Sequence, residues 1–149
     1  MDNWGVCFKM IDWLILVVLG SLIIASYLDI KYKQVPSVFL TGLLLIVAIM
    51  RIENLQFGIL AGLFAWVIRD LIFEYNGLDF GMADIKIIIL IGLLIPTMNM
   101  FLIFVGIFSV FQFAYTLVWQ WKFPNEKERP FIPCLLAVLV ALALIGGVA

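Results

Sequence analysis

The chain contains no histidine among its 149 residues. This absence removes the commonest general base and the commonest zinc ligand of proteins. The only two cysteines, Cys7 and Cys134, are far apart and form no CxxC pattern. The sequence therefore predicts neither a metal site nor a redox pair, and no cofactor is expected. Cys134 falls within an apolar run, where a small buried thiol is the expected environment.

Charged residues are also scarce, at 13% of the chain, and the net charge is −1. Such a balance gives no reason to expect a nucleic-acid partner. Hydrophobic residues make up 66% of the sequence, which is more than a soluble domain of this size needs. Continuous apolar runs are typical of membrane-spanning helices, which need about 20 mostly apolar residues each. The lack of strict alternation argues against a membrane β-barrel.

Six apolar runs are separated by short polar connections. The expected spans are residues 12–28, 37–50, 55–75, 79–95, 98–121 and 131–148. The first run leads directly into another hydrophobic segment, so it is interpreted as a retained helix rather than a signal peptide. The chain is accordingly predicted to be a single all-α polytopic domain over residues 1–149, with six transmembrane helices in a lipid bilayer.

The distribution of lysine and arginine predicts an orientation. The connections after the first, third and fifth runs hold most of these residues, namely Lys31, Lys33, Lys122, Lys127 and Arg129. The opposite end has only Lys9 and Arg51. By the positive-inside rule, the lysine-rich end faces the cytoplasm and both termini face outside.

Two aspartates stand at this predicted cytoplasmic end. Asp29 closes the first run, and Asp84 lies five residues into the fourth, roughly 7 Å from its start at 1.5 Å per residue. Two carboxylates a few ångströms apart share one proton, so that one accepts a proton from water while the other donates to a carbonyl. An aspartate at a helix start is also a common N-cap, and one at a helix end a common boundary residue. These features alone leave both interpretations open.

The neighbours of Asp84 are compatible with a site. Gly81 and Ala83 have almost no side chain and would let another helix or an extended peptide approach the backbone. Lys86 is expected to reach toward the lipid headgroups or to pair with an acid.

Further acids lie on the same side. Asp70 and Glu74 are four residues apart and share a helix face, where Arg69 and solvent would neutralise them. Alternatively, together with Asp79, they attract basic residues of a substrate. An aromatic series at helical spacing is expected to pack or to contact lipid: Phe101, Phe104, Phe108, Phe111 and Tyr115.

Three segments resemble signatures of one family, the type IV prepilin and archaeal preflagellin peptidases, which are GxGD-type intramembrane aspartic proteases. "DIKYKQVP" resembles the first aspartate signature, and "GMADIK" resembles the GxGD-type motif. "RPFIPCLLA" resembles the Pro-aromatic-x-Pro opening of the last helix. The matching positions are Asp29, Val35 and Pro36; Gly81, Ala83, Asp84 and Lys86; and Pro130, Phe131 and Pro133.

The resemblance implies a fold and an activity. It implies a six-helix GxGD protease bundle in the cell membrane, with Asp29 and Asp84 as the catalytic acids. The other motif residues would support the motifs or bind substrate. The substrates would be pilin-like or flagellin precursors, cut at the cytoplasmic face between a short basic leader and a hydrophobic helix. Ala83 replaces a glycine of many bacterial members, which is closer to the archaeal pattern. Because the chain lacks the cysteine-containing domain of bifunctional members, peptidase activity alone is expected.

Two other functions stay open. A presenilin-like intramembrane protease shares a GxGD motif, but there the first acid follows tyrosine directly and a Pro-Ala-Leu motif comes later. Here Tyr27 stands two residues before Asp29, and no Pro-Ala-Leu occurs. A small cation- or proton-coupled transporter would also use membrane acids, yet such proteins often show inverted repeats, and this sequence has no clear repeat.

Overall fold

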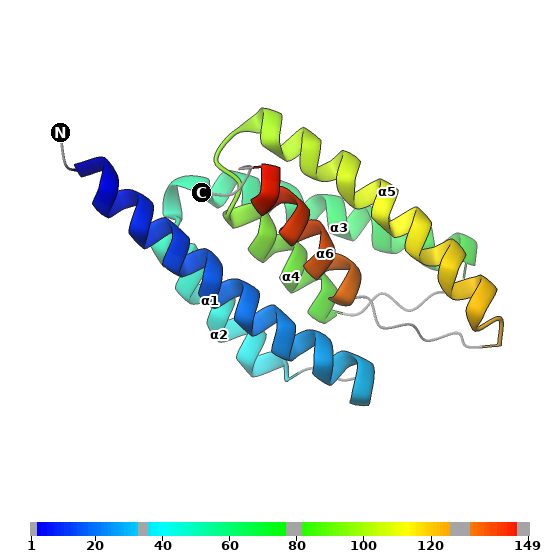
Figure 1. The fold of residues 1–149 in the computed structure, drawn as a ribbon. Coiled ribbons are helices and arrows are strands. Elements are labelled where there is room, and N and C mark those ends of the chain that lie inside the picture. Colours follow the sequence, from blue (N-terminus) through cyan, green and yellow to red (C-terminus); the bar gives the residue numbers. More distant parts are fainter. Residues whose placement is uncertain (1–2, 33–35, 77–81, 126–131, 146–149) are drawn as a thin grey trace.

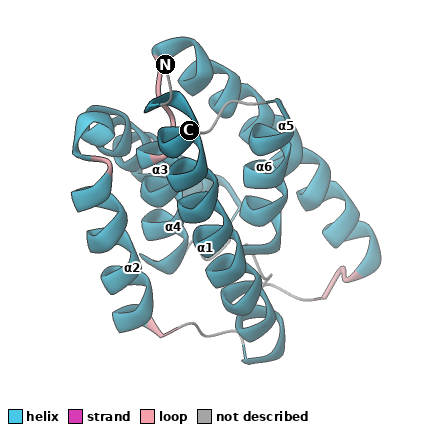
Figure 2. Ribbon diagram, turned by 60° about the vertical axis from the view of Figure 1, so that its left-hand side comes forward, coloured by secondary structure: helices cyan, strands magenta, loops and turns pink. Residues whose placement is uncertain are grey.

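The computed structural model is all-helical over the residues that it describes: 3–32, 36–76, 82–125 and 132–145, with side chains described from 13–32, 36–71, 82–125 and 132–145. These residues form six α-helices and one short 3₁₀ helix, arranged as a bundle (Figures 1 and 2). In chain order they are α1 (Asn3–Tyr32), α2 (Ser37–Met50), η1 (Ile52–Asn54), α3 (Leu55–Asn76), α4 (Met82–Leu93), α5 (Met98–Lys122) and α6 (Ile132–Ile145).

Within the described residues, three stretches are long and apolar enough to cross a membrane by length and composition: Trp13–Tyr32, Ile52–Leu71 and Met98–Lys122. The chain is therefore compatible with a helical membrane protein. α2 and α6 are apolar but have only 14 residues each, and α4 has 12. At 1.5 Å per residue α4 is about 18 Å long, well short of a hydrocarbon core of about 30 Å.

Among the helix ends that the structure describes, three differ from the expected spans by more than one residue. α1 ends at Tyr32 rather than at residue 28. α1 begins at Asn3 rather than near residue 12, because neither Lys9 nor Asp12 is a helix breaker. α4 ends at Leu93 rather than at residue 95. The backbone N–H groups of Leu94 and Ile95 bond three residues back, at 3.0 and 3.1 Å, so the last turn tightens just before Pro96.

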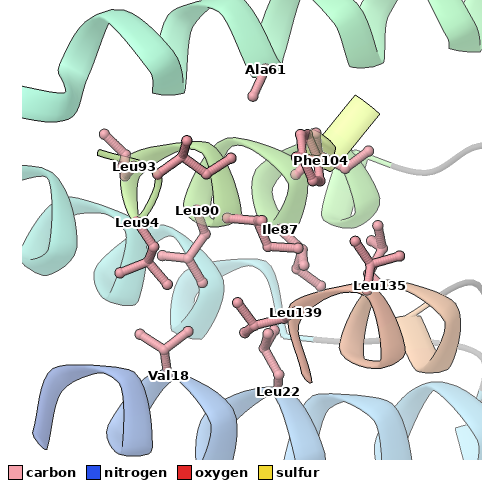
Figure 3. Close-up of a cluster of buried hydrophobic side chains, with 14 of the residues drawn as sticks. Val18, Leu22, Ala61, Ile87, Leu90, Leu93, Leu94, Phe104, Leu135 and Leu139 are labelled. Atoms are coloured by element: carbon pink, nitrogen blue, oxygen red, sulfur yellow. The ribbon is translucent and has the colours of Figure 1, made fainter. Parts of the chain in front are cut away.

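α4 is the buried centre of the bundle. Eight of its 12 residues are buried, while Met82, Lys86 and Ile89 share a face that is more exposed. α2, α3 and α6 pack against it. Figure 3 shows Ala61 of α3 on one side of α4 and Val18 and Leu22 of α1 on the other.

The crossing of α3 and α4 depends on glycine. A Cβ added to Gly92 would lie 2.6 Å from the Cβ of Ala61 and 2.7 Å from the carbonyl oxygen of Phe57. A Cβ on Gly58 would meet the Leu93 side chain at 2.7 Å. With Gly62, Gly58 forms a GxxxG pattern, which lets two helix backbones approach closely. The close crossing therefore fixes α4 against α3.

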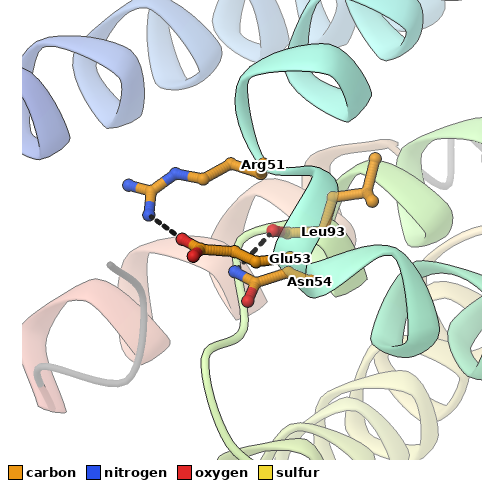
Figure 4. Close-up of polar contacts among 4 residues, drawn as sticks. All are labelled: Arg51, Glu53, Asn54 and Leu93. Atoms are coloured by element: carbon orange, nitrogen blue, oxygen red, sulfur yellow. Dashed lines mark hydrogen bonds and ion pairs between the residues drawn. The ribbon is translucent and has the colours of Figure 1, made fainter.

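The end of the bundle where α2 meets α3 is held by polar contacts (Figure 4). The buried Asn54 donates a hydrogen bond of 3.1 Å from its side-chain amide to the carbonyl of Leu93. This bond satisfies one of the carbonyls left without a partner at the C-terminus of α4. Arg51 and Glu53 form an ion pair of 4.0 Å beside it.

Aromatic packing joins α5 to α3. The expected packing is confirmed for Phe101, Phe104 and Phe108, which are all buried. The Phe64 ring lies edge-on to Phe104 and Phe108, with centroids 6.5 and 5.7 Å apart. Cys134 is buried as expected, with its Sγ 3.9 Å from the side-chain oxygen of Gln112.

Candidate functional site

Asp29 lies near the C-terminal end of α1 and is half-buried. Its Oδ2 accepts a hydrogen bond of 3.2 Å from the backbone N–H of Ile132, the first residue of α6. The first four N–H groups of a helix have no partner within the helix. The Asp29 carboxylate therefore caps α6 from a segment 103 residues away in sequence.

Asp84 lies in the first turn of α4 and is only 8% exposed. It is the one carboxylate among the buried residues of the described chain. A carboxylate inside an apolar bundle is costly to desolvate, so its presence calls for a reason beyond packing. Ala83 beside it is half-buried, and its single methyl group adds little bulk there.

Lys86 joins the starts of α4 and α2. Its Nζ donates to Ser37 Oγ at 2.5 Å and to Thr41 Oγ1 at 2.8 Å. The Thr41 hydroxyl in turn donates to the Ser37 carbonyl at 2.8 Å. Both hydroxyls lie on one face of α2 because they are four residues apart. Lys86 follows Asp84 by two residues in the sequence, and two hydroxyls of the neighbouring helix α2 hold its ammonium group in place.

These contacts belong to one end of the bundle. The Asp29 bond joins the end of α1 to the start of α6, and the Lys86 bonds join the start of α4 to the start of α2. Near the same point, the guanidinium of Arg69 in α3 lies 3.6 Å from the sulfur of Met82, the first residue of α4. α6 packs against both α1 and α4. Asp29 and Asp84 therefore lie at the same end, on two of the helices that pack against α6.

The remaining predicted residues lie as follows. Pro36 precedes α2 and is exposed, Pro133 is half-buried as the second residue of α6, and Asp70 is exposed on α3. Gly81, Asp79, Pro130 and the side chain of Glu74 lie outside the described residues.

No cluster of three or more metal-ligating side chains occurs in the part of the chain that the structure describes. The groups that the described residues place at this end include the carboxylates of Asp29 and Asp84, the ammonium group of Lys86, the guanidinium of Arg69 and two hydroxyls of α2.

Comparison with known proteins adds no relative. No protein-family model, curated protein or solved structure matches this chain. The resemblance to the prepilin and preflagellin peptidases consequently rests on the motif residues themselves.

The hydrogen-bond partners of Lys86 and Asp29 were not predicted from the sequence. Ser37 and Thr41, spaced four residues apart at the start of an apolar helix, were the readable signal for a polar contact on that face. The bond from Ile132 to Asp29 had no local signal, because the two residues are distant in sequence and only packing brings them together.

Proposed function

We propose that this protein is a membrane-embedded aspartic endopeptidase that removes the basic leader peptide from pilin-like or archaeal flagellin precursors. One observation carries the proposal. Two aspartates 55 positions apart in the sequence lie at the same end of the bundle, one bonded to the start of α6 and one buried at the start of α4. The motif resemblance around both residues supports the same activity.

In the proposed reaction the two acids share one proton. The ionised carboxylate takes a proton from a water molecule, and the water oxygen attacks the scissile carbonyl carbon. The protonated carboxyl donates its proton to the carbonyl oxygen. When the C–N bond breaks, the proton taken from water passes to the departing amine. The reaction needs no metal and no cofactor.

The contacts around the two acids are compatible with one acting as general base and the other as general acid. The Ile132 N–H orients the Asp29 carboxylate, while the Lys86 bonds to α2 hold the start of α4 that carries Asp84. Two acids held by different helices keep a defined relation only if both helices are anchored at that end. Anchoring of this kind is what general acid–base catalysis requires of its geometry.

The proposed substrate has two chemically different parts. Its hydrophobic helix would rest in the bilayer among the helices, and its extended leader would cross the two acids. Ala83, and Gly81 by its lack of a side chain, would give the backbone room. We propose Asp70, Glu74 and Asp79 as the acids that attract the basic leader residues, since Asp70 is exposed on α3.

We further propose that all six helices are embedded in the cell membrane, with the Asp29–Asp84 end toward the cytoplasm and both termini outside. The excess of lysine at that end supports this orientation. α4 need not reach both faces, because most of its residues are buried against α2, α3 and α6.

The test is cleavage of a precursor by purified protein. Wild type, Asp29→Asn and Asp84→Asn would be incubated with a pilin-like precursor, and its shortening followed by mass. Glu53→Gln is the matched control, because Glu53 is 76% exposed and belongs to the Arg51 ion pair at the other end. Wild type and the control should cut between the basic leader and the apolar helix. If either aspartate variant still hydrolyses the precursor, the proposed catalytic pair of Asp29 and Asp84 is wrong. Failure of wild type to cut any such precursor would contradict the proposed function and favour the transporter interpretation instead.

A further inference from the structure

An apolar groove runs along the outer face of α2, α3 and α4. Its volume is about 440 Å³, within the roughly 300–1,000 Å³ typical of small-molecule sites. All its lining residues are apolar. Those used below are Ala48, Ile59, Gly62, Leu63, Trp66 and Met82. Ile59, Leu63 and Trp66 are each more than half exposed, so the groove opens to the surroundings of the bundle.

One end of the α2–α3–α4 groove carries a positive charge. The guanidinium carbon of Arg69 lies 5.8 Å from the centre of the Trp66 ring. Its Nη1 lies 3.6 Å from the sulfur of Met82. Since Trp66 and Met82 both line the groove, the guanidinium is at its mouth.

Arg69 differs from the other arginine of the described chain. Arg51 is paired with Glu53 at 4.0 Å, whereas Arg69 forms no ion pair with any residue that the structure describes. A guanidinium presents several N–H donors in a planar fork that matches a phosphate group. Arg69 also lies two residues before the end of the apolar stretch Ile52–Leu71. In a bilayer this position corresponds to the level of the headgroups.

The geometry points to a binding site for an anionic glycerophospholipid, with one acyl chain in the α2–α3–α4 groove and the phosphate on Arg69. The apolar lining suits a hydrocarbon chain, and the Arg69 guanidinium at the mouth suits the charged end of the same molecule. Gly58 and Gly62 contribute to this groove because they leave no side chain in it. The proposal does not depend on the proposed peptidase chemistry, because none of the residues used here is one of the two proposed catalytic acids.

The test measures lipid retained by the purified chain. Protein would be reconstituted into vesicles of equal parts phosphatidylglycerol and phosphatidylcholine with identical acyl chains, extracted in mild detergent, and its bound lipids counted by native mass spectrometry. Wild type should retain one lipid with a clear excess of phosphatidylglycerol. Arg69→Gln should reduce retained phosphatidylglycerol about tenfold, the lower range for a lost charge-assisted hydrogen bond. Arg51→Gln is the matched control and should retain the wild-type amount.

A second pair of variants tests the acyl-chain part. Ala48→Phe fills the α2–α3–α4 groove, so this variant should retain neither phosphatidylglycerol nor phosphatidylcholine. Ala114→Phe adds the same side chain to a separate groove between α5 and α6, so this variant should retain the same lipids as wild type. Equal phosphatidylglycerol retention by wild type and Arg69→Gln overturns the proposal, as does equal loss from both phenylalanine variants. A dimer that forms without lipid and is broken by Ala48→Phe would assign the groove to a second copy instead. If Ala48→Phe does not fold, the comparison of Arg69→Gln with its control Arg51→Gln tests the proposal alone. None of these readouts requires peptidase activity.

Discussion

Asp29 has a structural contact and a proposed chemical role, and two substitutions at this position separate them. Its Oδ2 accepts the Ile132 N–H at the start of α6. Asparagine keeps an oxygen that can accept this bond but cannot serve as an acid or base. Alanine removes both the acceptor and the acid. Comparison of the two variants therefore distinguishes a cap from a catalyst.

The structure sets the expected loss of stability. Alanine leaves the Ile132 N–H without its acceptor, and removal of an N-cap side chain costs about 1 kcal/mol, with a range of about 0.5–2 kcal/mol. Because Asp29 is half-buried, water replaces the lost acceptor only in part, so we expect about 1–2 kcal/mol for Asp29→Ala. For Asp29→Asn we expect less than about 0.5 kcal/mol, since asparagine is as good a cap as aspartate.

Activity should follow a different order. Loss of a general acid or base typically costs about 10²–10⁴-fold in rate, so both variants should be inactive against a precursor that wild type cleaves. Thermal unfolding in detergent measures the stability, and the initial rate of leader release measures the activity. Each rate would be taken well below the unfolding temperature of the weaker variant.

One outcome would refute the reasoning. If Asp29→Asn cleaves at a rate near that of wild type while Asp29→Ala is unstable and inactive, Asp29 is a helix cap and not a catalytic residue. Asp84 would then have to act without it, and the proposed proton-sharing pair would be wrong.

Two further predictions concern the packing at the C-terminal end of α4, opposite the end that carries Asp84. Gly92→Ala should destabilise the bundle by about 1–3 kcal/mol, because the added Cβ would lie 2.6 Å from Ala61; Gly106→Ala, where a Cβ meets nothing within 4 Å, should be neutral or slightly stabilising in the same unfolding assay. Asn54→Leu should cost about 1–3 kcal/mol, because it removes the donor to the buried end of α4 at the Leu93 carbonyl. An unchanged unfolding temperature in Gly92→Ala would contradict the close crossing of α3 and α4.

Helix positions were largely readable from the sequence. α2 occupies the expected residues 37–50, since Pro36 marks its start and a polar segment follows its end. α3 and α5 agree with the expected spans to within one residue. Apolar periodicity and helix-stop residues are local signals, so they locate helices without knowledge of the packing.

The arrangement of the site was less readable. That Asp29 and Asp84 lie at one end followed from counting helices, but the cap on α6 did not, because no local pattern links Asp29 to Ile132. Lys86 was expected to reach headgroups or an acid, and its hydroxyl partners on α2 depend on the angle at which the two helices meet. The length of α4 was overestimated, because hydropathy continues to Ile95 while the helix tightens after Leu93.

The close packing between particular helices has a consequence for the two aspartates. The backbones approach closely between α4 and its neighbours α2 and α3, and again between α6 and its neighbours α1 and α5. The bundle thus divides into two sets of three helices, with one aspartate in each: Asp84 belongs to the first set and Asp29 to the second. The link between the sets runs through the α4–α6 contact and large interleaved side chains such as Phe64 and Phe104. Because Asp84 and Asp29 belong to different sets, the separation of the two carboxylates depends on how the two sets pack against each other.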